Sequence, residues 1–241
     1  MIELTVIAVF SVVQSLFGIG LLVFGTPTLL LLGFPFDHTL AVLLPASLAI
    51  SVLQVLISPR VEVAFARSFV IWCLVPIGVT LALVFWLQLQ SGLNLVVALA
   101  LAAFVAQRWL PQRGEVARRW VAQHERTCLL LMGVVHGLSN LGGGLLTIFA
   151  ASRRREKVQI RGLISFCYAG MATSQLIVLA WLHSELFGWR QLVYAAISSC
   201  VFLIVGQRVF RGVSNPLFEW LLTAFMTGFA GLLGLRTVGL L

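Results

Sequence analysis

The chain has 241 residues, of which 60% are hydrophobic and only 10% are charged. Soluble domains are close to half apolar and a quarter charged, so this composition excludes a soluble fold and indicates a polytopic membrane protein. The net charge of +8 indicates basic loops on the cytoplasmic side of a membrane, and we predict no nucleic-acid partner.

Eight apolar stretches follow one another along the chain, and a membrane helix needs about 20 residues. The first stretch is too long for one straight span, because its helix would reach about 45 Å across a hydrocarbon core of about 30 Å. The opening residues, MIELTVIAVF, lack the basic region and cleavage site of a signal peptide, so we expect them to be retained. The stretches lie at residues 4–33, 38–58, 68–88, 92–107, 127–151, 162–183, 190–207 and 217–235.

The distribution of Lys and Arg decides how the first and fifth stretches run. If all eight stretches cross the membrane, the sixteen basic residues divide nine to seven, which is no bias. If 4–33 and 127–151 each enter and leave on one side, only Arg190 and Arg236 lie opposite the other fourteen. Because cytoplasmic loops carry the excess of Lys and Arg, the second arrangement is favoured. It predicts six crossings, two re-entrant hairpins and an N-terminus outside the cell.

The two halves of the chain resemble each other around the interrupted stretches. Gln14 matches His136, and after a two-residue insertion Gly18 and Gly20 match Gly142 and Gly144. Further on, SLAISVLQVLI at 47–57 matches YAGMATSQLIV at 168–178, which pairs Gln54 with Gln175.

Each half therefore holds one hairpin and three crossings, and an odd number of crossings turns the second half upside down. We predict an all-α polytopic membrane protein made of two inverted-topology repeats, each a re-entrant, broken helical hairpin plus three transmembrane helices. The N-terminal repeat covers 1–110 and the C-terminal repeat covers 127–241. Residues 111–126 between them, broken by Pro111 and Gly114, are expected to form an interfacial linker on the cytoplasmic face.

The breaks have the chemistry of an anion site. A half-helix that begins near mid-membrane has unpaired N–H groups and a partial positive charge at its start. Glycine there lets a ligand approach the backbone closely. Two such starts, facing each other across the midplane, would bind an anion without a buried cation.

Neutral donors cluster at and after the breaks. Ser47, Ser51 and Gln54 recur on one helix face, and their counterparts begin at Tyr168. The alternative for each glycine is close helix packing, and for each Ser or Thr a bond to its own helix. The predicted substrate-binding residues are Gln14, Gly18, Gly20, Ser47, Ser51, Gln54, His136, Ser139, Asn140, Gly142, Gly143, Gly144, Tyr168, Thr173, Ser174 and Gln175.

His136 is, cysteines aside, the one titratable group that the sequence places deep in a stretch, and such residues are candidates for function. It either carries a coupling proton or acts as a neutral donor. The four cysteines have no metal-like spacing, and we predict neither a metal site nor a cofactor.

The segments SLFGIGLLVFGTP and HGLSNLGGGLLTIFAASRRR, with YAGMATSQ downstream, resemble the TauE/SafE sulfite exporter family over nearly the whole chain. The resemblance implies transport of sulfite, sulfoacetate or related sulfonates. This chain departs from the family pattern in its first break, which reads GIG instead of GGG, so the two half-sites are not expected to be equivalent.

Together these features predict a multi-pass secondary transporter of the bacterial inner membrane. We expect it to export sulfite or a small sulfur-containing organic anion by alternating access around a midplane site. An uptake carrier and a passive anion channel remain alternatives within transport. A membrane-embedded enzyme would need a nucleophile–base pair, clustered carboxylates or metal ligands at one depth, and we do not predict one. The expected partners are a small anion and the lipid bilayer, and the oligomeric state, a homodimer included, is left open.

Overall fold

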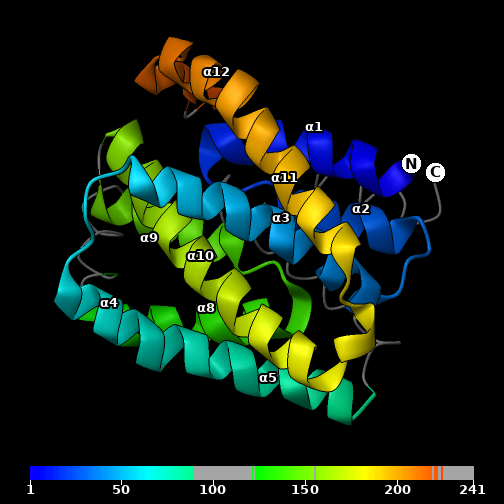
Figure 1. The fold of residues 1–241 in the computed structure, drawn as a ribbon. Helices are drawn as coiled ribbons and strands as arrows, with labels where there is room; N and C mark the ends of the chain where they lie inside the picture. The colour runs from blue at the N-terminus through cyan, green and yellow to red at the C-terminus, as the bar shows by residue number, and fades with distance from the viewer. Residues whose placement is uncertain (89–120, 122, 155, 219, 222–223, 225–241) are drawn as a thin grey trace.

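The computed structural model describes residues 1–88, 121, 123–154, 156–218, 220–221 and 224, and this part of the chain contains helices and no strand. The expected stretch 92–107 lies outside the described residues, as do most of 217–235 and most of the linker 111–126. The α-helices are α1 (Ile2–Phe17), α2 (Thr26–Leu31), α3 (Phe36–Leu56), α4 (Val63–Phe69), α5 (Val75–Trp86), α8 (Glu125–Ser139), α9 (Gly143–Arg153), α10 (Lys157–Leu182), α11 (Trp189–Val201) and α12 (Gln207–Gly212) (Figure 1). Single π-turns at Leu21–Gly25, Val70–Leu74 and Phe202–Gly206 and a 3₁₀ turn at Ser184–Leu186 complete the elements.

Four of these helical runs are long and apolar enough to cross a membrane. They are Phe36–Leu56, Val63–Trp86, Lys157–Leu182 and Trp189–Gly212, and each corresponds to an apolar stretch expected from the sequence. The membrane-length helices predicted there are therefore confirmed for the described part of the chain.

Two further stretches that the structure describes, 4–33 and 127–151, are broken, as the sequence predicted. The first divides into α1 and a shorter run, Leu21–Leu31. The second divides into α8 and α9, with the break between Ser139 and Gly143.

Each broken stretch folds back so that its two ends meet. His38, just after the first stretch, bonds Glu3 at the start of α1, with 2.6 Å between Nε2 and Oε1. Arg153 at the end of α9 pairs with Glu125 at the start of α8. Both stretches are thus helical hairpins. The two ends of the first hairpin lie beside the start of α3. The C-terminal end of the second hairpin lies near the loop between α3 and α4.

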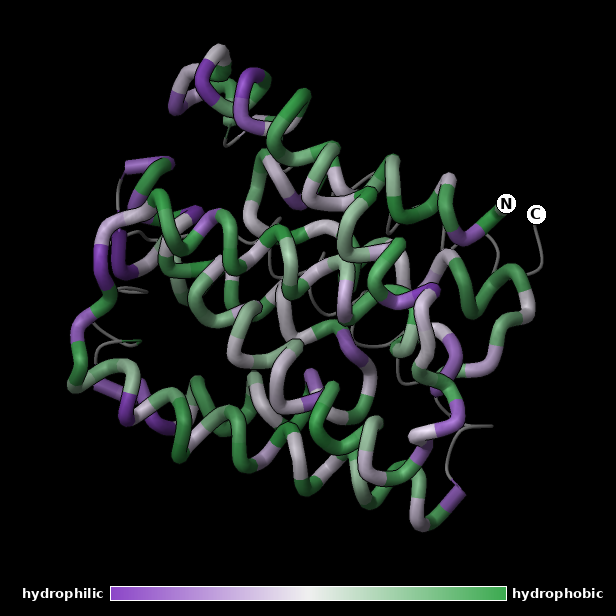
Figure 2. The backbone as a smooth tube through the Cα atoms, in the orientation of Figure 1, coloured by the Kyte–Doolittle hydropathy of each residue, from purple (hydrophilic) through white to green (hydrophobic). Residues whose placement is uncertain are grey.

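The loop after α3 and the junction between α9 and α10 lie together. Arg154 Nη2 donates to Glu62 Oε1 at 3.2 Å. Figure 2 shows hydrophilic residues gathered at this end of the bundle.

Glycine allows α8 to lie directly against its neighbours. A Cβ at Gly133 would come 2.5 Å from the carbonyl oxygen of Cys73, and one at Gly137 would come 1.9 Å from Thr80 Oγ1. Membrane helices associate through such close backbone contacts because lipid provides no hydrophobic driving force between them. This packing holds the first arm of the second hairpin against the Val63–Trp86 span.

Candidate functional site

The first break begins where α1 ends in a left-handed residue. Gly18 has φ +79°, and its N–H donates to the Gln14 carbonyl at 2.8 Å, which caps the helix. Two residues later, a Cβ on Gly20 would lie 2.4 Å from the Gln14 backbone nitrogen and 2.7 Å from the Phe10 carbonyl. Gly20 therefore serves close packing of the returning chain on α1, one of the two alternatives that the sequence left open.

The Gln14 side chain closes the first break from within. Its Oε1 accepts from the Leu21 N–H at 3.2 Å, which is the first amide of the returning helix. Its Nε2 donates to the Ser47 carbonyl at 2.9 Å, to Ser47 Oγ at 3.0 Å and to Ser51 Oγ at 3.2 Å. This amide thus occupies both the helix start and the serines of α3 that the sequence offered to an anion.

Gln54 and Arg161 complete the hydrogen bonding around the end of α1. Gln54 Nε2 donates to the carbonyls of Gln14 and Ser15 at 3.0 and 3.1 Å, and its Oε1 accepts from Ser165 Oγ at 2.8 Å. Arg161 Nη1 also donates to the Ser15 carbonyl, at 3.2 Å, and its guanidinium lies 3.4 Å from the centre of the Phe210 ring. A cation at the negative end of a helix is stabilising. Arg161 lies just before the expected stretch 162–183, but its side chain is buried and supports this break.

The second break repeats the backbone of the first. Asn140 ends α8 with φ +61°, and its N–H donates to the His136 carbonyl at 2.7 Å. A Cβ on Gly142 would lie 2.5 Å from His136 Cβ and 2.9 Å from the Met132 carbonyl. Each contact has its counterpart 122 positions earlier, in Gly18, Gln14, Gly20 and Phe10.

The constant spacing corrects one detail of the repeat. The sequence match inserted two residues and paired Gly18 with Gly142 and Gly20 with Gly144, but the backbone pairs Gly18 with Asn140 and Gly20 with Gly142. Glycine letters alone misled the match, because asparagine also adopts the left-handed conformation at low cost.

The polar groups of the second break differ from those of the first. His136 Nε2 lies 3.1 Å from Gln175 Oε1, and the ring of Tyr168 meets the imidazole at an angle of 60° with 6.2 Å between ring centres. All three side chains are fully buried. Yet His136 Nδ1, Gln175 Nε2, the Tyr168 hydroxyl and Asn140 Oδ1 have no hydrogen-bond partner among the described residues. Buried polar atoms are nearly always paired, so these four unpaired atoms are candidates to bind a ligand.

The two breaks lie against each other. Asn140 Nδ2 lies 2.8 Å from Oγ1 of Thr26, the first residue of α2. A Cβ on Gly143 would come 1.8 Å from the Tyr168 hydroxyl and 2.7 Å from Val23 of the first hairpin. The start of α9 is thus enclosed by Tyr168 and the first hairpin.

Three of the predicted side chains bond elsewhere. Thr173 is exposed and bonds the Ala169 carbonyl of its own helix, and Ser174 Oγ donates to the Leu74 carbonyl at 3.1 Å. Ser139 Oγ donates to the Val135 carbonyl and accepts from the Leu141 N–H at the break. The structure does not bring Thr173 and Ser174 to the others. Of the glycine triplet, Gly144 is buried in α9, where its N–H donates to the Leu141 carbonyl at 3.3 Å.

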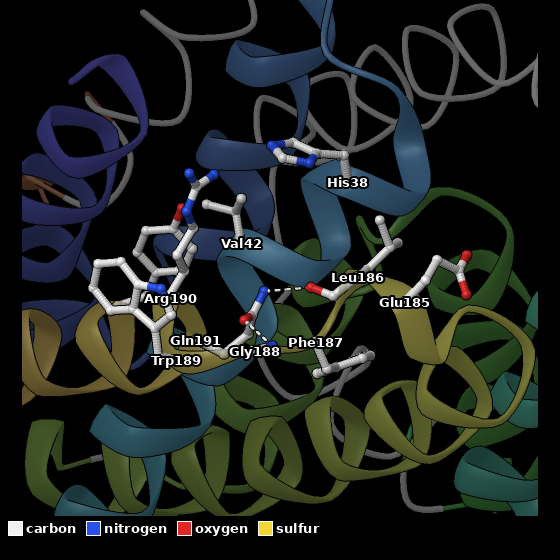
Figure 3. Close-up of a pocket in the computed structure, with 10 residues that line it drawn as sticks. His38, Val42, Glu185, Leu186, Phe187, Gly188, Trp189, Arg190 and Gln191 are labelled. Carbon is white, nitrogen blue, oxygen red and sulfur yellow. Dashed lines mark hydrogen bonds between the residues drawn. The ribbon is translucent and has the colours of Figure 1, made fainter.

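A pocket of about 330 Å³ lies away from both breaks, at the start of α11. Figure 3 shows Arg190, Trp189 and His38 around it, with Gln191 bonded back to the preceding turn. Beside it, Tyr194 donates to Glu3, which His38 also bonds. Burial raises the pKa of the Glu3 carboxyl, but the bonds from Tyr194 and His38 outweigh burial and leave that pKa below its ordinary value.

No group of three or more His, Cys, Asp or Glu residues in the described ranges could hold a metal ion. The side chains at the second break are neutral hydrogen-bonding groups, which suit a small polar or anionic ligand.

The model of the Sulfite exporter TauE/SafE family matches residues 4–233. The search of the curated proteins found no match, and neither did the search of the solved structures. The family match covers nearly the whole chain, and the chain therefore belongs to the TauE/SafE sulfite exporter family. Together with its apolar helices, this makes it a membrane transport protein.

Proposed function

We propose that this TauE/SafE family member is a secondary transporter that exports sulfite or a small organic sulfonate across the bacterial inner membrane. Its substrate site is the second break, bounded by His136, Tyr168, Gln175 and Asn140. The observation that carries the proposal is the set of four buried polar atoms there without a partner. An oxyanion would accept from Tyr168 and Gln175, and the start of α9 would favour its negative charge.

The first break has the supporting role in this proposal. Gln14 accepts from the first amide of the equivalent helix start, so that N–H is not available to a substrate. Alternating access would then move the second hairpin relative to a first hairpin that is fixed by its own hydrogen bonds. The site is closed in the present conformation, because Gly143 and Tyr168 are in direct contact.

The proposed topology has two re-entrant hairpins in inverted repeats, with the N-terminus outside. The Glu62–Arg154 and Glu125–Arg153 pairs support it, since each joins segments that the re-entrant arrangement puts on one side. The test is labelling of single cysteines by a membrane-impermeant maleimide in oriented vesicles, in a background lacking the four native cysteines. Glu62→Cys and Arg154→Cys should react from the cytoplasmic side and Glu185→Cys from the other. Labelling of Glu62→Cys and Arg154→Cys from opposite sides would exclude the hairpin.

The transport proposal is tested in proteoliposomes with radiolabelled sulfite. Tyr168→Phe should lower the initial rate at least about tenfold, because a hydrogen bond to a charged group contributes about 1.5–3 kcal/mol. The matched control is Ser199→Ala, which removes a hydroxyl that bonds only its own helix in α11. Equal rates for wild type and Tyr168→Phe would remove the second break from the pathway.

A carrier is separated from a channel by the form of the flux. We expect saturation with sulfite and counterflow, in which external sulfite accelerates loss of internal label. Linear flux without counterflow would indicate a passive channel instead.

A further inference from the structure

The His136–Gln175 pair has a hydrogen-bonding property that does not depend on how its atoms are assigned. A neutral imidazole has two tautomers, and an amide can bond through its oxygen or its nitrogen. If His136 Nε2–H donates to Gln175 Oε1, the pair is left with an acceptor at Nδ1 and a donor at the amide nitrogen. If the amide is turned, it donates to Nε2, and the pair is left with a donor at Nδ1–H and an acceptor at the amide oxygen. A neutral pair therefore always presents at least one donor and at least one acceptor.

Asn140 and Tyr168 extend this mixed pattern. Asn140 uses one amide atom on Thr26 and leaves the other free, and the Tyr168 hydroxyl can donate or accept. A ligand that only accepts hydrogen bonds would leave at least one buried acceptor of the His136–Gln175 pair unpaired. Leaving a buried group unsatisfied costs about 1–3 kcal/mol. The ligand that fits is one that both accepts and donates.

The surroundings of this pair offer no fixed charge for a dianion. Tyr168 faces His136 from α10, and the backbone of Gly142 faces it from the start of α9. From the Val63–Trp86 span, the residues nearest to the glycines of α8 are Cys73 and Pro76 at Gly133 and Ile77 and Thr80 at Gly137, and none of them is Asp, Glu, Lys, Arg or His. The buried arginine among the described residues, Arg161, is bonded at the first break. A buried charge without a partner is strongly unfavourable.

We propose that the second break takes up sulfite together with one proton. The proton lies either on the substrate, as hydrogensulfite beside neutral His136, or on the imidazole, as the sulfite dianion beside protonated His136. The two forms have the same atoms and the same total charge, and they differ only by transfer of the proton between a sulfite oxygen and His136 Nδ1. In the second form the imidazole donates from both nitrogens, so the dianion no longer faces an unpaired acceptor. This inference rests on the proposed function and specifies its substrate.

The experiment measures protons and sulfite in the same binding reaction. Full-length protein in detergent, in weakly buffered solution at about pH 8.5 with a pH indicator, is mixed with sulfite, and bound sulfite is counted with a radiolabel. Sulfite is mostly the dianion under these conditions. We expect about one proton to be taken up per sulfite bound. By linkage, the apparent affinity for total sulfite should then fall about tenfold for each further pH unit.

The variant His136→Gln determines where the proton can reside. Glutamine cannot be protonated, but a sulfite that carries its own proton still can bind, so uptake of about one proton per bound sulfite should persist with weaker affinity. The control Ser199→Ala should match wild type in both quantities.

The outcomes separate this inference from the proposed function. Sulfite binding with no proton uptake in wild type would overturn the inference and leave the transport function standing. Proton uptake that occurs in wild type but is absent in His136→Gln, with binding retained, would also overturn it, because an uncharged second break would then bind the sulfite dianion without a proton. Absence of any sulfite binding to wild type between about pH 6 and pH 8.5 would instead reject the proposed function.

Discussion

The two breaks have the same backbone conformation but differ in how many of their side-chain polar atoms lack a hydrogen-bond partner. In both, a left-handed residue ends the first helix and a glycine two residues later packs on that helix. At the first break Gln14 and Gln54 use their amide groups on the protein itself. At the second, His136 and Gln175 bond each other and leave one atom each unpaired. The same local fold thus has its amide side chains bonded within the protein in one half and leaves buried polar atoms unpaired in the other.

The largest expected effect comes from disrupting the glycine contact with the preceding helix, which both breaks have in common. Gly20→Ala and Gly142→Ala each place a Cβ within 2.5 Å of the preceding helix, at the Gln14 nitrogen and at His136 Cβ, respectively. Both substitutions should abolish folded protein, measured as the monodisperse fraction after extraction in mild detergent. Gly188→Ala is the control, since a Cβ there meets nothing within 4 Å. A well-folded Gly20→Ala protein with normal transport would contradict the shared backbone contact.

The next prediction separates support from binding. Gln14→Ala removes an amide with four hydrogen-bond contacts and leaves buried groups unpaired, so it should lower stability by about 2–4 kcal/mol. Tyr168→Phe removes a hydroxyl that has no partner and should change stability by less than about 1 kcal/mol. Thermal unfolding of the detergent-solubilised proteins measures both. A large loss of stability for Tyr168→Phe would mean that its hydroxyl is paired in the folded protein.

A smaller effect is expected where the left-handed residues differ. Asn140→Gly gives the second break the residue of the first, which relieves the left-handed asparagine but removes its bond to Thr26. These changes have opposite signs, so stability should remain within about 1 kcal/mol of wild type. Sulfite binding should weaken, because Asn140 Oδ1 belongs to the proposed site. Unchanged sulfite affinity in Asn140→Gly would show that this oxygen does not contact the substrate.

The smallest effect concerns Glu3, which lies at the start of α1 and is bonded by His38 and Tyr194. The pKa of Glu3 is below its ordinary value in the folded protein, so ionised Glu3 contributes stability that is present above the unfolded-state pKa. That contribution is lost as the pH falls through the folded-state pKa. The Tm of wild type should therefore decrease on acidification by a few degrees more than the Tm of Glu3→Gln. Parallel Tm curves for the two proteins would contradict the role of the Tyr194 and His38 bonds.

Much of this architecture follows from the sequence, and the reasons differ between elements. The four long spans are long apolar runs, and length against bilayer thickness identifies them directly. The positions of the breaks follow from glycine and asparagine inside apolar runs. The pairing of Gln14 with His136 was also evident, because VVQSL at 12–16 matches VVHGL at 134–138. In the structure each lies four residues before the left-handed residue that caps its helix.

The details of the site were harder to predict because they depend on helix faces and on contacts between distant segments. Tyr168 and Gln175 are seven residues apart and share a face of α10, whereas Thr173, five residues from Tyr168, points to the other side. That periodicity could have excluded Thr173 in advance. The contact of Asn140 with Thr26 joins residues 114 positions apart, and no local pattern announces it.

The hydrogen bonds between the halves also have a consequence for biosynthesis. In the first half, Gln54 accepts a hydrogen bond from Ser165, and the Ser15 carbonyl at the end of α1 accepts one from Arg161. Both donors belong to the second half. Because synthesis proceeds from the N-terminus, the first hairpin enters the membrane before these partners have been translated. The Ser15 carbonyl and the Gln54 amide oxygen form these hydrogen bonds only once α10 has been synthesised and has packed against them. In the nascent chain, the hydrogen bonding of the first hairpin therefore depends on Arg161 and Ser165, which are translated later.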